Sequence, residues 1–334
     1  MKKRDIALLA GGAIGAAVAI KLLTRPSTVK FEDVCHLVAN SDHSDFIEID
    51  GIRIHFQEFG DDSNPTIILI HGYAASTHSW SISAPKLADE GYRVIALDLV
   101  GFGFSEKPKW FDYTIDAQAR IVERFMDRLG IGRATVIGSS YGGAVAATLA
   151  LDYPERVEKL GMVAAVINDE QLEHPLMQLA AMPAVAEVVT PFLLDSRTYV
   201  TAKLKTIFAP ANHDMITPAR VSAFHRPLKA ADSHRSVVAT SRNWSANRVE
   251  QDLGLIKQPT LIIWGDQDQI VPLANGAKLY QEVLNSRFFV FKECGHLPQE
   301  ERAGLFVDLV AEFCGNEKGK ITNETGRVET DTYV

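Results

Sequence analysis

The chain contains 334 residues, of which 46% are hydrophobic and 23% are charged, a balance typical of a folded globular protein with a sizeable core. A formal net charge of -8 and a pI near 5.7 argue against a nucleic-acid-binding protein, because such a protein presents a basic face. The cysteines, Cys35, Cys294 and Cys314, have no CxxC spacing and no neighbouring histidine cluster. We therefore expect no disulfide framework, no metal site and no cofactor.

Residues 1–26 begin with three basic side chains, continue with an uncharged apolar run and end at Pro26. A helix over residues 6–23 would be about 27 Å long, which is marginal for a hydrocarbon core of about 30 Å. We predict an uncleaved N-terminal anchor, which makes the membrane a partner and places the catalytic domain outside the cytoplasm. A cleaved signal peptide, giving a secreted or periplasmic protein, stays open because residues 17–19 resemble a cleavage site. A merely buried helix is the remaining alternative.

Strand-like and helix-like patterns alternate through the middle of the chain. Residues 46–60 predict a hairpin that turns at Asp50-Gly51. Further apolar runs, rich in β-branched residues, predict strands at residues 66–72, 92–100, 134–140, 159–166, 259–268 and 287–296. Such runs are typical of strands that are buried on both faces, and helical stretches such as residues 114–130 separate them. The pattern predicts an α/β protein with a mostly parallel, doubly wound sheet.

One long segment, from about residue 167 to residue 248, interrupts this alternation with helical pieces that are punctuated by prolines. A long insertion without strands between two sheet strands predicts a lid. Its apolar first part either packs onto the core or lines a hydrophobic substrate pocket. The predicted domains are an N-terminal hydrophobic segment (1–26), the first part of the core (27–166), a helical cap (167–249), the second part of the core (250–314) and a disordered polar tail (315–334).

Two adjacent serines, Ser139 and Ser140, follow one of the predicted strands in the sequence GSSYG. A nucleophile on a sharp strand-to-helix turn needs small residues two positions away on each side, because bulky side chains would collide there. Glycines flank Ser140 at this distance, whereas Ile137 and Tyr141 flank Ser139. The spacing therefore predicts Ser140 as the nucleophile.

A serine hydroxyl needs a base and a group that orients the base. His296 follows a late predicted strand and is the candidate base, and both Asp266 and Asp268 follow the strand before it. Functional groups gather at the carboxyl ends of such strands. We prefer Asp268 as the acid because it lies further past the strand, where a loop can turn toward the sheet; Asp266, the alternative, is expected to shape the turn.

The oxyanion of an acyl-transfer reaction needs backbone N–H donors. We expect them from Tyr141, which follows the nucleophile, and from Tyr73 in the early loop IHGYAAS, where Gly72 allows a close turn. His71, in the same loop, is expected to brace the loop and not to act as a second base.

The segments HGYAAS, DLVGFGFSEKP, GSSYGG, GDQDQIVP and GHLPQEE occur in this order within residues 46–314. Together they resemble the α/β-hydrolase superfamily, in its capped serine-hydrolase branch of esterases and monoacylglycerol lipases. The resemblance implies an eight-stranded α/β-hydrolase sheet with a helical cap inserted after the sixth strand. It also implies a triad of Ser140, Asp268 and His296 and an oxyanion hole from the Tyr73 and Tyr141 amides.

A serine at this position indicates attack on a carbonyl and an acyl-enzyme intermediate, whereas similar epoxide hydrolases and haloalkane dehalogenases carry aspartate there. We predict a carboxylic ester hydrolase whose partner is a small apolar ester substrate of the lipid or monoacylglycerol type. Three alternatives stay open: a carbon-carbon bond hydrolase of vinylogous diketones of the meta-cleavage product type, a cofactor-free perhydrolase, and a non-catalytic protein of this fold that binds a hydrophobic ligand.

Overall fold

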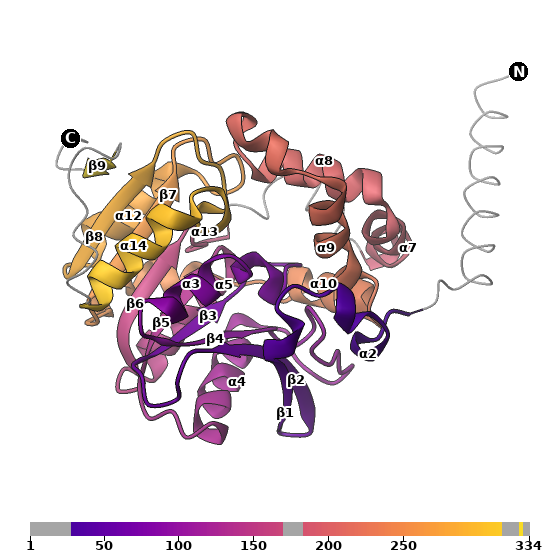
Figure 1. The fold of residues 1–334 in the computed structure, drawn as a ribbon, viewed down its shortest axis with the longest axis horizontal. Coiled ribbons are helices and arrows are strands. Elements are labelled where there is room, and N and C mark those ends of the chain that lie inside the picture. Colours follow the sequence, from indigo (N-terminus) through magenta and orange to yellow (C-terminus); the bar gives the residue numbers. More distant parts are fainter. Residues whose placement is uncertain (1–27, 170–182, 316–326, 330–334) are drawn as a thin grey trace, which may run out of the picture.

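The computed structural model describes residues 28–169, 183–315 and 327–329. Its strands form one sheet in the order β1-β2-β4-β3-β5-β6-β7-β8-β9 (Figure 1). The strands are β1 (Ser44–Ile49), β2 (Ile52–Phe59), β3 (Thr66–Ile70), β4 (Arg93–Leu97), β5 (Ala134–Ser139), β6 (Val157–Val163), β7 (Thr260–Gly265), β8 (Ser286–Phe291) and β9 (Arg327–Glu329). Strands β3 to β8 pair in parallel, while β1 with β2, β2 with β4 and β8 with β9 pair antiparallel.

The eight strands β1 to β8 confirm the predicted mostly parallel sheet that follows an antiparallel hairpin. The hairpin turns at Asp50 and Gly51, both with positive φ angles. Strand β9 falls inside the segment 315–334, for which composition predicts a disordered tail. Most of that segment, residues 316–326 and 330–334, lies outside the described residues.

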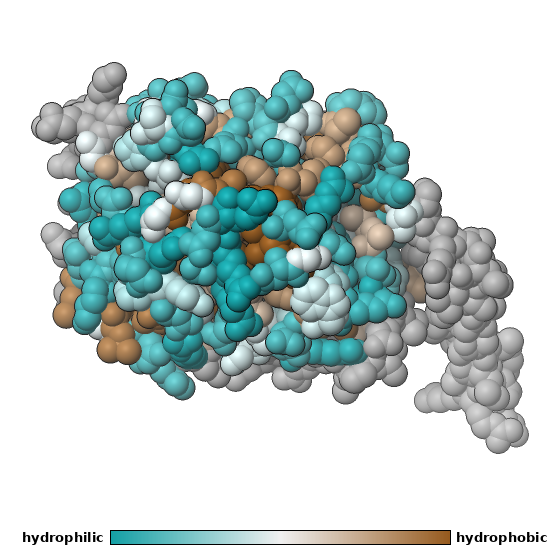
Figure 2. All heavy atoms as spheres, turned by 90° about the horizontal axis from the view of Figure 1, so that it is seen from below, coloured by the Kyte–Doolittle hydropathy of each residue, from teal (hydrophilic) through white to brown (hydrophobic). Residues whose placement is uncertain are grey.

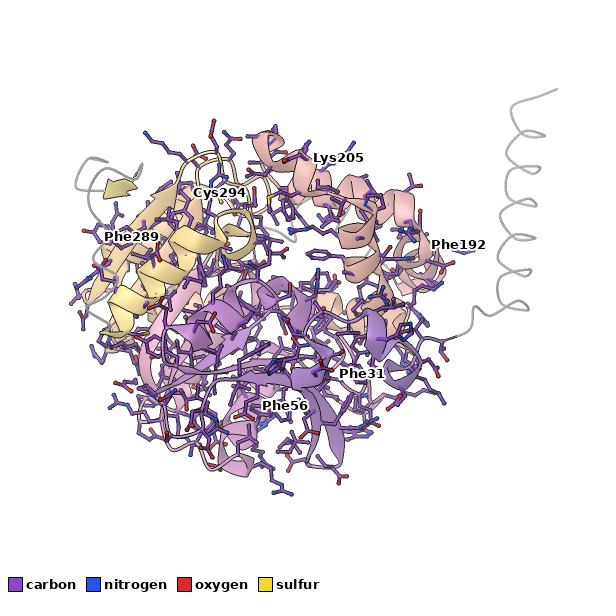
Figure 3. The ribbon with its side chains drawn as sticks, in the orientation of Figure 1. Phe31, Phe56, Phe192, Lys205, Phe289 and Cys294 are labelled. Carbon is purple, nitrogen blue, oxygen red and sulfur yellow. The ribbon has the colours of Figure 1, made fainter. Side chains whose placement is uncertain are left out.

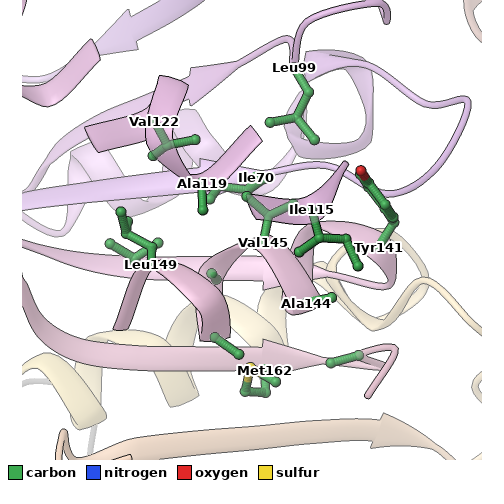
Figure 4. Packing of buried hydrophobic residues seen from close by; sticks show 14 of the residues in the cluster. Ile70, Leu99, Ile115, Ala119, Val122, Tyr141, Ala144, Val145, Leu149 and Met162 are labelled. Atoms are coloured by element: carbon green, nitrogen blue, oxygen red, sulfur yellow. The ribbon is translucent and has the colours of Figure 1, made fainter. Parts of the chain in front are cut away.

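Both faces of the sheet are buried, which explains why the strands read as continuous apolar runs. Successive residues of β3 alternate between two hydrophobic cores: Ile68 packs on the side of α4 (Ile115–Arg128) and α5 (Tyr141–Asp152), and Ile67 packs on the side of α3 (Ser83–Asp89) and α14 (Ala303–Cys314). Helix α12 (Leu273–Glu282) covers β7 and β8 on the first of these faces. Figure 4 shows Val145 and Leu149 of α5 beside Ala119 and Val122 of α4. The sheet is therefore doubly wound.

Between β6 and β7 the described chain is helical. The helices are α7 (Pro183–Asp195), α8 (Arg197–Ile207), α9 (Pro218–Leu228), α10 (Ser233–Arg242) and α11 (Asn247–Asp252). Helices α7 to α10 gather on one side of the molecule, apart from α12 and α14 (Figure 1). They form the helical cap expected after the sixth strand. Residues 170–182, in the apolar first part of the predicted cap, lie outside the described residues.

The predicted membrane anchor has to be corrected. In the three described stretches of the chain, no helix is both long and apolar enough to cross a bilayer. The segment behind the prediction, residues 1–26, lies outside these stretches. The membrane partner and the membrane-associated location that rested on it are therefore withdrawn. The face shown in Figure 2 is largely hydrophilic, with hydrophobic residues visible mainly near its middle.

Candidate active site

Ser140 lies in the turn between β5 and α5. Its backbone has φ 56° and ψ -120°, a strained conformation for a residue with a side chain. The Ser140 N–H donates to Val163 O at 2.9 Å, and its carbonyl oxygen accepts from Gly143 N at 2.9 Å and Val166 N at 3.0 Å. Three hydrogen bonds thus hold the strained turn in place.

The structure gives the two adjacent serines different surroundings. A Cβ atom on Gly138 would lie 2.0 Å from Gly142 O, and one on Gly142 would lie 2.4 Å from a carbonyl oxygen of β3, so both flanking positions require glycine. Ser139 is buried, and its Oγ accepts a hydrogen bond from Gln299 Nε2 at 3.2 Å. Ser140 is therefore the serine on the turn, and Ser139 takes part in a buried contact.

His296 and Asp268 come together at the ends of β8 and β7. His296 Nδ1 donates to Asp268 Oδ2 at 2.8 Å, and both side chains are almost completely buried. Asp268 Oδ1 accepts from the backbone N–H groups of Ile270 at 2.8 Å and Val271 at 3.0 Å, which orients the carboxylate. Because a carboxylate only accepts, the proton lies on Nδ1 and His296 Nε2 is available as a base.

Asp266, the alternative acid, has a different partner. Its Oδ1 accepts from Cys294 N at 3.2 Å and so joins the turn after β7 to the loop after β8. No hydrogen bond joins Ser140 Oγ to His296 within the described chain; bonds between a nucleophile and its base often tighten only when substrate binds. The structure therefore joins His296 to Asp268 and not to Asp266.

Tyr141 follows Ser140 in the chain, and Tyr73 follows Gly72, which packs against Ser140. Tyr141 is the first residue of α5, so its N–H has no acceptor within the helix. Gly72 approaches the serine so closely that a Cβ there would lie 3.6 Å from Ser140 Oγ. Neither amide donates to an acceptor in the described stretches. Two N–H groups near Ser140 without an acceptor in the described stretches are suited to stabilise a negative oxygen there.

Residues 65–303 match the family model for the α/β hydrolase fold. The chain belongs to the α/β hydrolase family. This membership confirms the predicted superfamily and fold, and it makes the protein a hydrolase. The matches do not single out the esterase and monoacylglycerol lipase branch.

This hydrolase is similar to several other hydrolases over most of its length. The 2-hydroxy-6-oxo-6-phenylhexa-2,4-dienoate hydrolase of Comamonas testosteroni is 32% identical over 308 residues, covering 87% of this chain and 98% of the relative. The structure of a meta-cleavage product hydrolase from Pseudomonas fluorescens IP01 has a TM-score of 0.69 and 26% identity, covering 81% of this chain and 97% of that one. A membrane phospholipase A, described as a bacterial virulence factor, has a TM-score of 0.64 and 27% identity, covering 94% of this chain and 98% of its own.

Four aromatic rings meet beside the amides of this hydrolase. The Trp244 ring lies 5.0 Å from that of Tyr141 and 5.7 Å from that of Tyr73, and Phe102 lies 5.9 Å from Tyr73. Tyr73 Oη donates to Val237 O of α10 at 2.7 Å. Burial raises the pKa of both phenols, so they stay protonated. Phe102 and Trp244 could not be identified from the sequence, because only the fold brings them to this loop.

The buried His71 braces the loop that contains Gly72 and Tyr73, as expected. His71 Nδ1 donates to Gly72 O at 2.7 Å, and Nε2 accepts from Leu99 N at 3.0 Å. Burial lowers the pKa of His71, so the imidazole is neutral and both nitrogens are engaged. Asp98 anchors the same region: it accepts from His55 Nδ1 at 2.7 Å and Thr77 N at 2.7 Å.

Asp98 stays ionised although it is buried. Burial favours the neutral acid, but His55, which donates to the carboxylate, and the backbone hydrogen bond from Phe104 hold the Asp98 pKa below its usual range. Ser105 Oγ donates to Asp98 O at 2.6 Å and closes this cluster. Among the described residues, no group of three or more His, Cys, Asp and Glu side chains could hold a metal ion.

Proposed function

We propose that this hydrolase cleaves the carbon-carbon bond of a vinylogous diketone of the meta-cleavage product type, with Ser140 as the nucleophile. The observation that carries the proposal is the similarity to the Comamonas hydrolase of that kind, which extends over 98% of the relative. The structural neighbour from Pseudomonas fluorescens supports it. The comparisons thus favour this alternative over the predicted ester hydrolase.

The chemistry begins with attack of Ser140 Oγ on a ketone carbonyl, while His296 Nε2 takes the serine proton. Asp268 holds the imidazole in position and stabilises the imidazolium that forms. The negative oxygen of the tetrahedral intermediate is stabilised by the amides of Tyr73 and Tyr141, whose N–H groups have no other acceptor in the described chain.

The carbon-carbon bond then breaks. Its electron pair passes into the conjugated chain and onto the second carbonyl, and the leaving group takes a proton from the His296 imidazolium. Water, deprotonated by His296, hydrolyses the acyl-enzyme and restores Ser140. One diketone and one water thus give one carboxylic acid and one enol. The same machinery serves an ester if the leaving atom is oxygen.

The direct test uses the purified full chain and 2-hydroxy-6-oxo-6-phenylhexa-2,4-dienoate, a dienol that becomes the vinylogous diketone when its hydroxyl proton moves to C5. We expect the conjugated absorbance to decay with release of one benzoate for each dienoate consumed, and Ser140→Ala to abolish the reaction. Folded protein that releases no benzoate while hydrolysing acyl esters would overturn the proposal.

A carboxylic ester of an apolar acyl group is the second candidate substrate. It is favoured by the phospholipase A neighbour, which aligns with 94% of this chain, compared with 81% for the meta-cleavage neighbour. Comparing kcat/KM for the dienoate with kcat/KM for p-nitrophenyl esters of increasing acyl length discriminates the two. A ratio above about 100 in favour of an ester, which corresponds to about 2.7 kcal/mol of transition-state binding, would replace the first proposal with this one.

A further inference from the structure

Three consecutive buried polar side chains follow the candidate base in the short helix α13 (Pro298–Glu301). Gln299, Glu300 and Glu301 are 0%, 3% and 5% exposed. Burying carboxylates is costly unless hydrogen bonds or opposite charges compensate. The partners of these side chains therefore indicate what the helix does.

Glu301 binds the backbone on both sides of His296. Its carboxylate accepts from Gly295 N at 3.0 Å and from Leu297 N at 3.3 Å, the residues that flank the histidine. The same carboxylate accepts from the cap, at 2.8 Å from Ala209 N and 2.7 Å from Asn212 Nδ2. One buried carboxylate thus joins the histidine loop to the segment that follows α8.

The histidine loop also touches the cap directly. His296 N donates to Ile207 O at 2.8 Å. A Cβ on Gly295 would lie 2.3 Å from Ile207 O and 2.7 Å from Ala209 N, so the two backbones are in close contact. Leu297 packs in the small hydrophobic core of α8 and α9. Figure 3 shows Cys294, just before this loop, on the same edge of the molecule as Lys205 of α8.

The two preceding side chains complete the junction. Glu300 Oε2 accepts from Arg220 Nη1 of α9 at 3.0 Å, which is a second link to the cap. Gln299 Nε2 donates to Ser139 beside the nucleophile at 3.2 Å. Helix α13 therefore contacts the cap, the loop that carries His296 and the turn that carries Ser140.

We propose that Glu301 is a positioning residue that sets the direction of His296 by holding its loop against the cap. The inference rests on the proposed function, because it assumes that His296 is the base for Ser140. Glu301 contacts no reacting atom and acts only through the backbone amides that it binds. The position of the cap and the direction of the His296 side chain therefore depend on the same carboxylate in this hydrolase.

The carboxylate is essential to this role because it only accepts hydrogen bonds. Four N–H groups donate to its two oxygens, and charge-assisted bonds of this kind are roughly twice as strong as neutral ones. In Glu301→Gln, one oxygen becomes an NH₂ group that faces N–H donors. The loop must then shift, and a misplacement of about 1 Å in a catalytic group costs about 100-fold in rate.

The test follows covalent labelling of the full chain by a fluorophosphonate, which needs an activated serine but not the natural substrate. The inactivation rate constant, the inhibitor dissociation constant and the final labelled fraction are measured for each variant. For Glu301→Gln we expect a rate constant about 10- to 100-fold lower, an unchanged dissociation constant and complete final labelling. Glu293→Gln is the matched control, since it removes an exposed carboxylate of the same loop whose ion-pair partner among the described residues is Arg302, and it should stay within about twofold of wild type.

The outcomes are separable. Equal rate constants for Glu301→Gln and Glu293→Gln would overturn the inference, as would a smaller labelled fraction with an unchanged rate constant, which signals loss of folded protein alone. If Glu301→Gln does not fold, Asn212→Ala removes the cap's side-chain bond to Glu301, together with the Asn212 bonds to Glu293 O and Arg302. It should slow labelling about three- to tenfold, since the bond to Glu301 is charge-assisted; no change would overturn the inference. Labelling that persists in Ser140→Ala refutes the proposed function instead.

Discussion

Replacing Asp268 with asparagine tests whether this carboxylate orients His296 as the base. The Asp268 carboxylate accepts three hydrogen bonds: one from His296 Nδ1 and two from the backbone N–H groups of Ile270 and Val271. An asparagine has a single acceptor oxygen. If this oxygen faces the backbone donors, the amide NH₂ faces His296 Nδ1, which must then accept. The proton moves to Nε2, and the imidazole can no longer take a proton from Ser140.

The expected loss follows from this change of tautomer. A base held in the wrong tautomer lowers kcat by about 10⁴-fold in serine hydrolases with the same arrangement. The free energy of unfolding should fall by only about 1 to 2 kcal/mol, because the two backbone bonds survive and the bond to His296 is kept with its direction reversed, now between neutral groups.

The assay is kcat for the dienoate, or the fluorophosphonate labelling rate, at several pH values, with thermal unfolding as a check on folding. Asp266→Asn is the matched control: it changes the same chemical group two residues away and affects only the contact with Cys294 N. It should retain activity within about tenfold of wild type, the cost of a single hydrogen bond. A loss below tenfold for Asp268→Asn, or a larger loss for Asp266→Asn, would refute the assignment of the acid.

Three further changes have defined outcomes. Tyr73→Phe keeps the ring and the backbone amide but removes the hydrogen bond to a carbonyl oxygen of α10. The free energy of unfolding, measured by denaturant titration, should fall by about 0.5 to 1.5 kcal/mol, and an unchanged midpoint would show that the bond contributes nothing. Gly138→Ala places a Cβ 2.0 Å from a carbonyl oxygen of α5 and should give little soluble protein, whereas Gly132→Ala meets nothing within 4 Å and should express normally. Burial raises the pKa of Glu300 from 4.5 to about 8 despite its arginine partner. The native state therefore binds more protons than the unfolded state between these values, and the free energy of unfolding falls as the pH rises from about 4.5 through 8. Glu300→Gln should flatten that dependence in denaturant titrations, and an undiminished slope would contradict the shift.

Local patterns of the sequence were enough to predict most of the sheet. Continuous apolar runs indicate strands buried on both faces, and β1 to β8 confirm them. Ser140 could be preferred over Ser139 because the turn requires glycine two positions before and two positions after the serine, which is a local pattern. In contrast, β9 lies in a stretch whose composition resembles a disordered tail, and the pattern does not reveal that it pairs with β8.

Contacts between distant residues could not be predicted in this way. Glu301 and Ala209 are 92 positions apart in the chain, and Tyr73 and Val237 are 164 apart. No periodicity reports such pairs. The membrane prediction was also wrong. It was drawn from the hydropathy of residues 1–26 alone, and no described helix supports it.

The sequence by itself determined the hydrolase family, the strands whose ends carry the motifs, and the candidate nucleophile, because these depend on local spacing and on burial of both sheet faces. Only the tertiary structure shows which carboxylate reaches His296: Asp268, the one preferred from the sequence, bonds to it, whereas Asp266 bonds to Cys294 N. It also decided that the cap is bonded to the histidine loop through Glu301. Hydrogen-bond partners are set by positions in space, and residues adjacent in sequence can point to different ones.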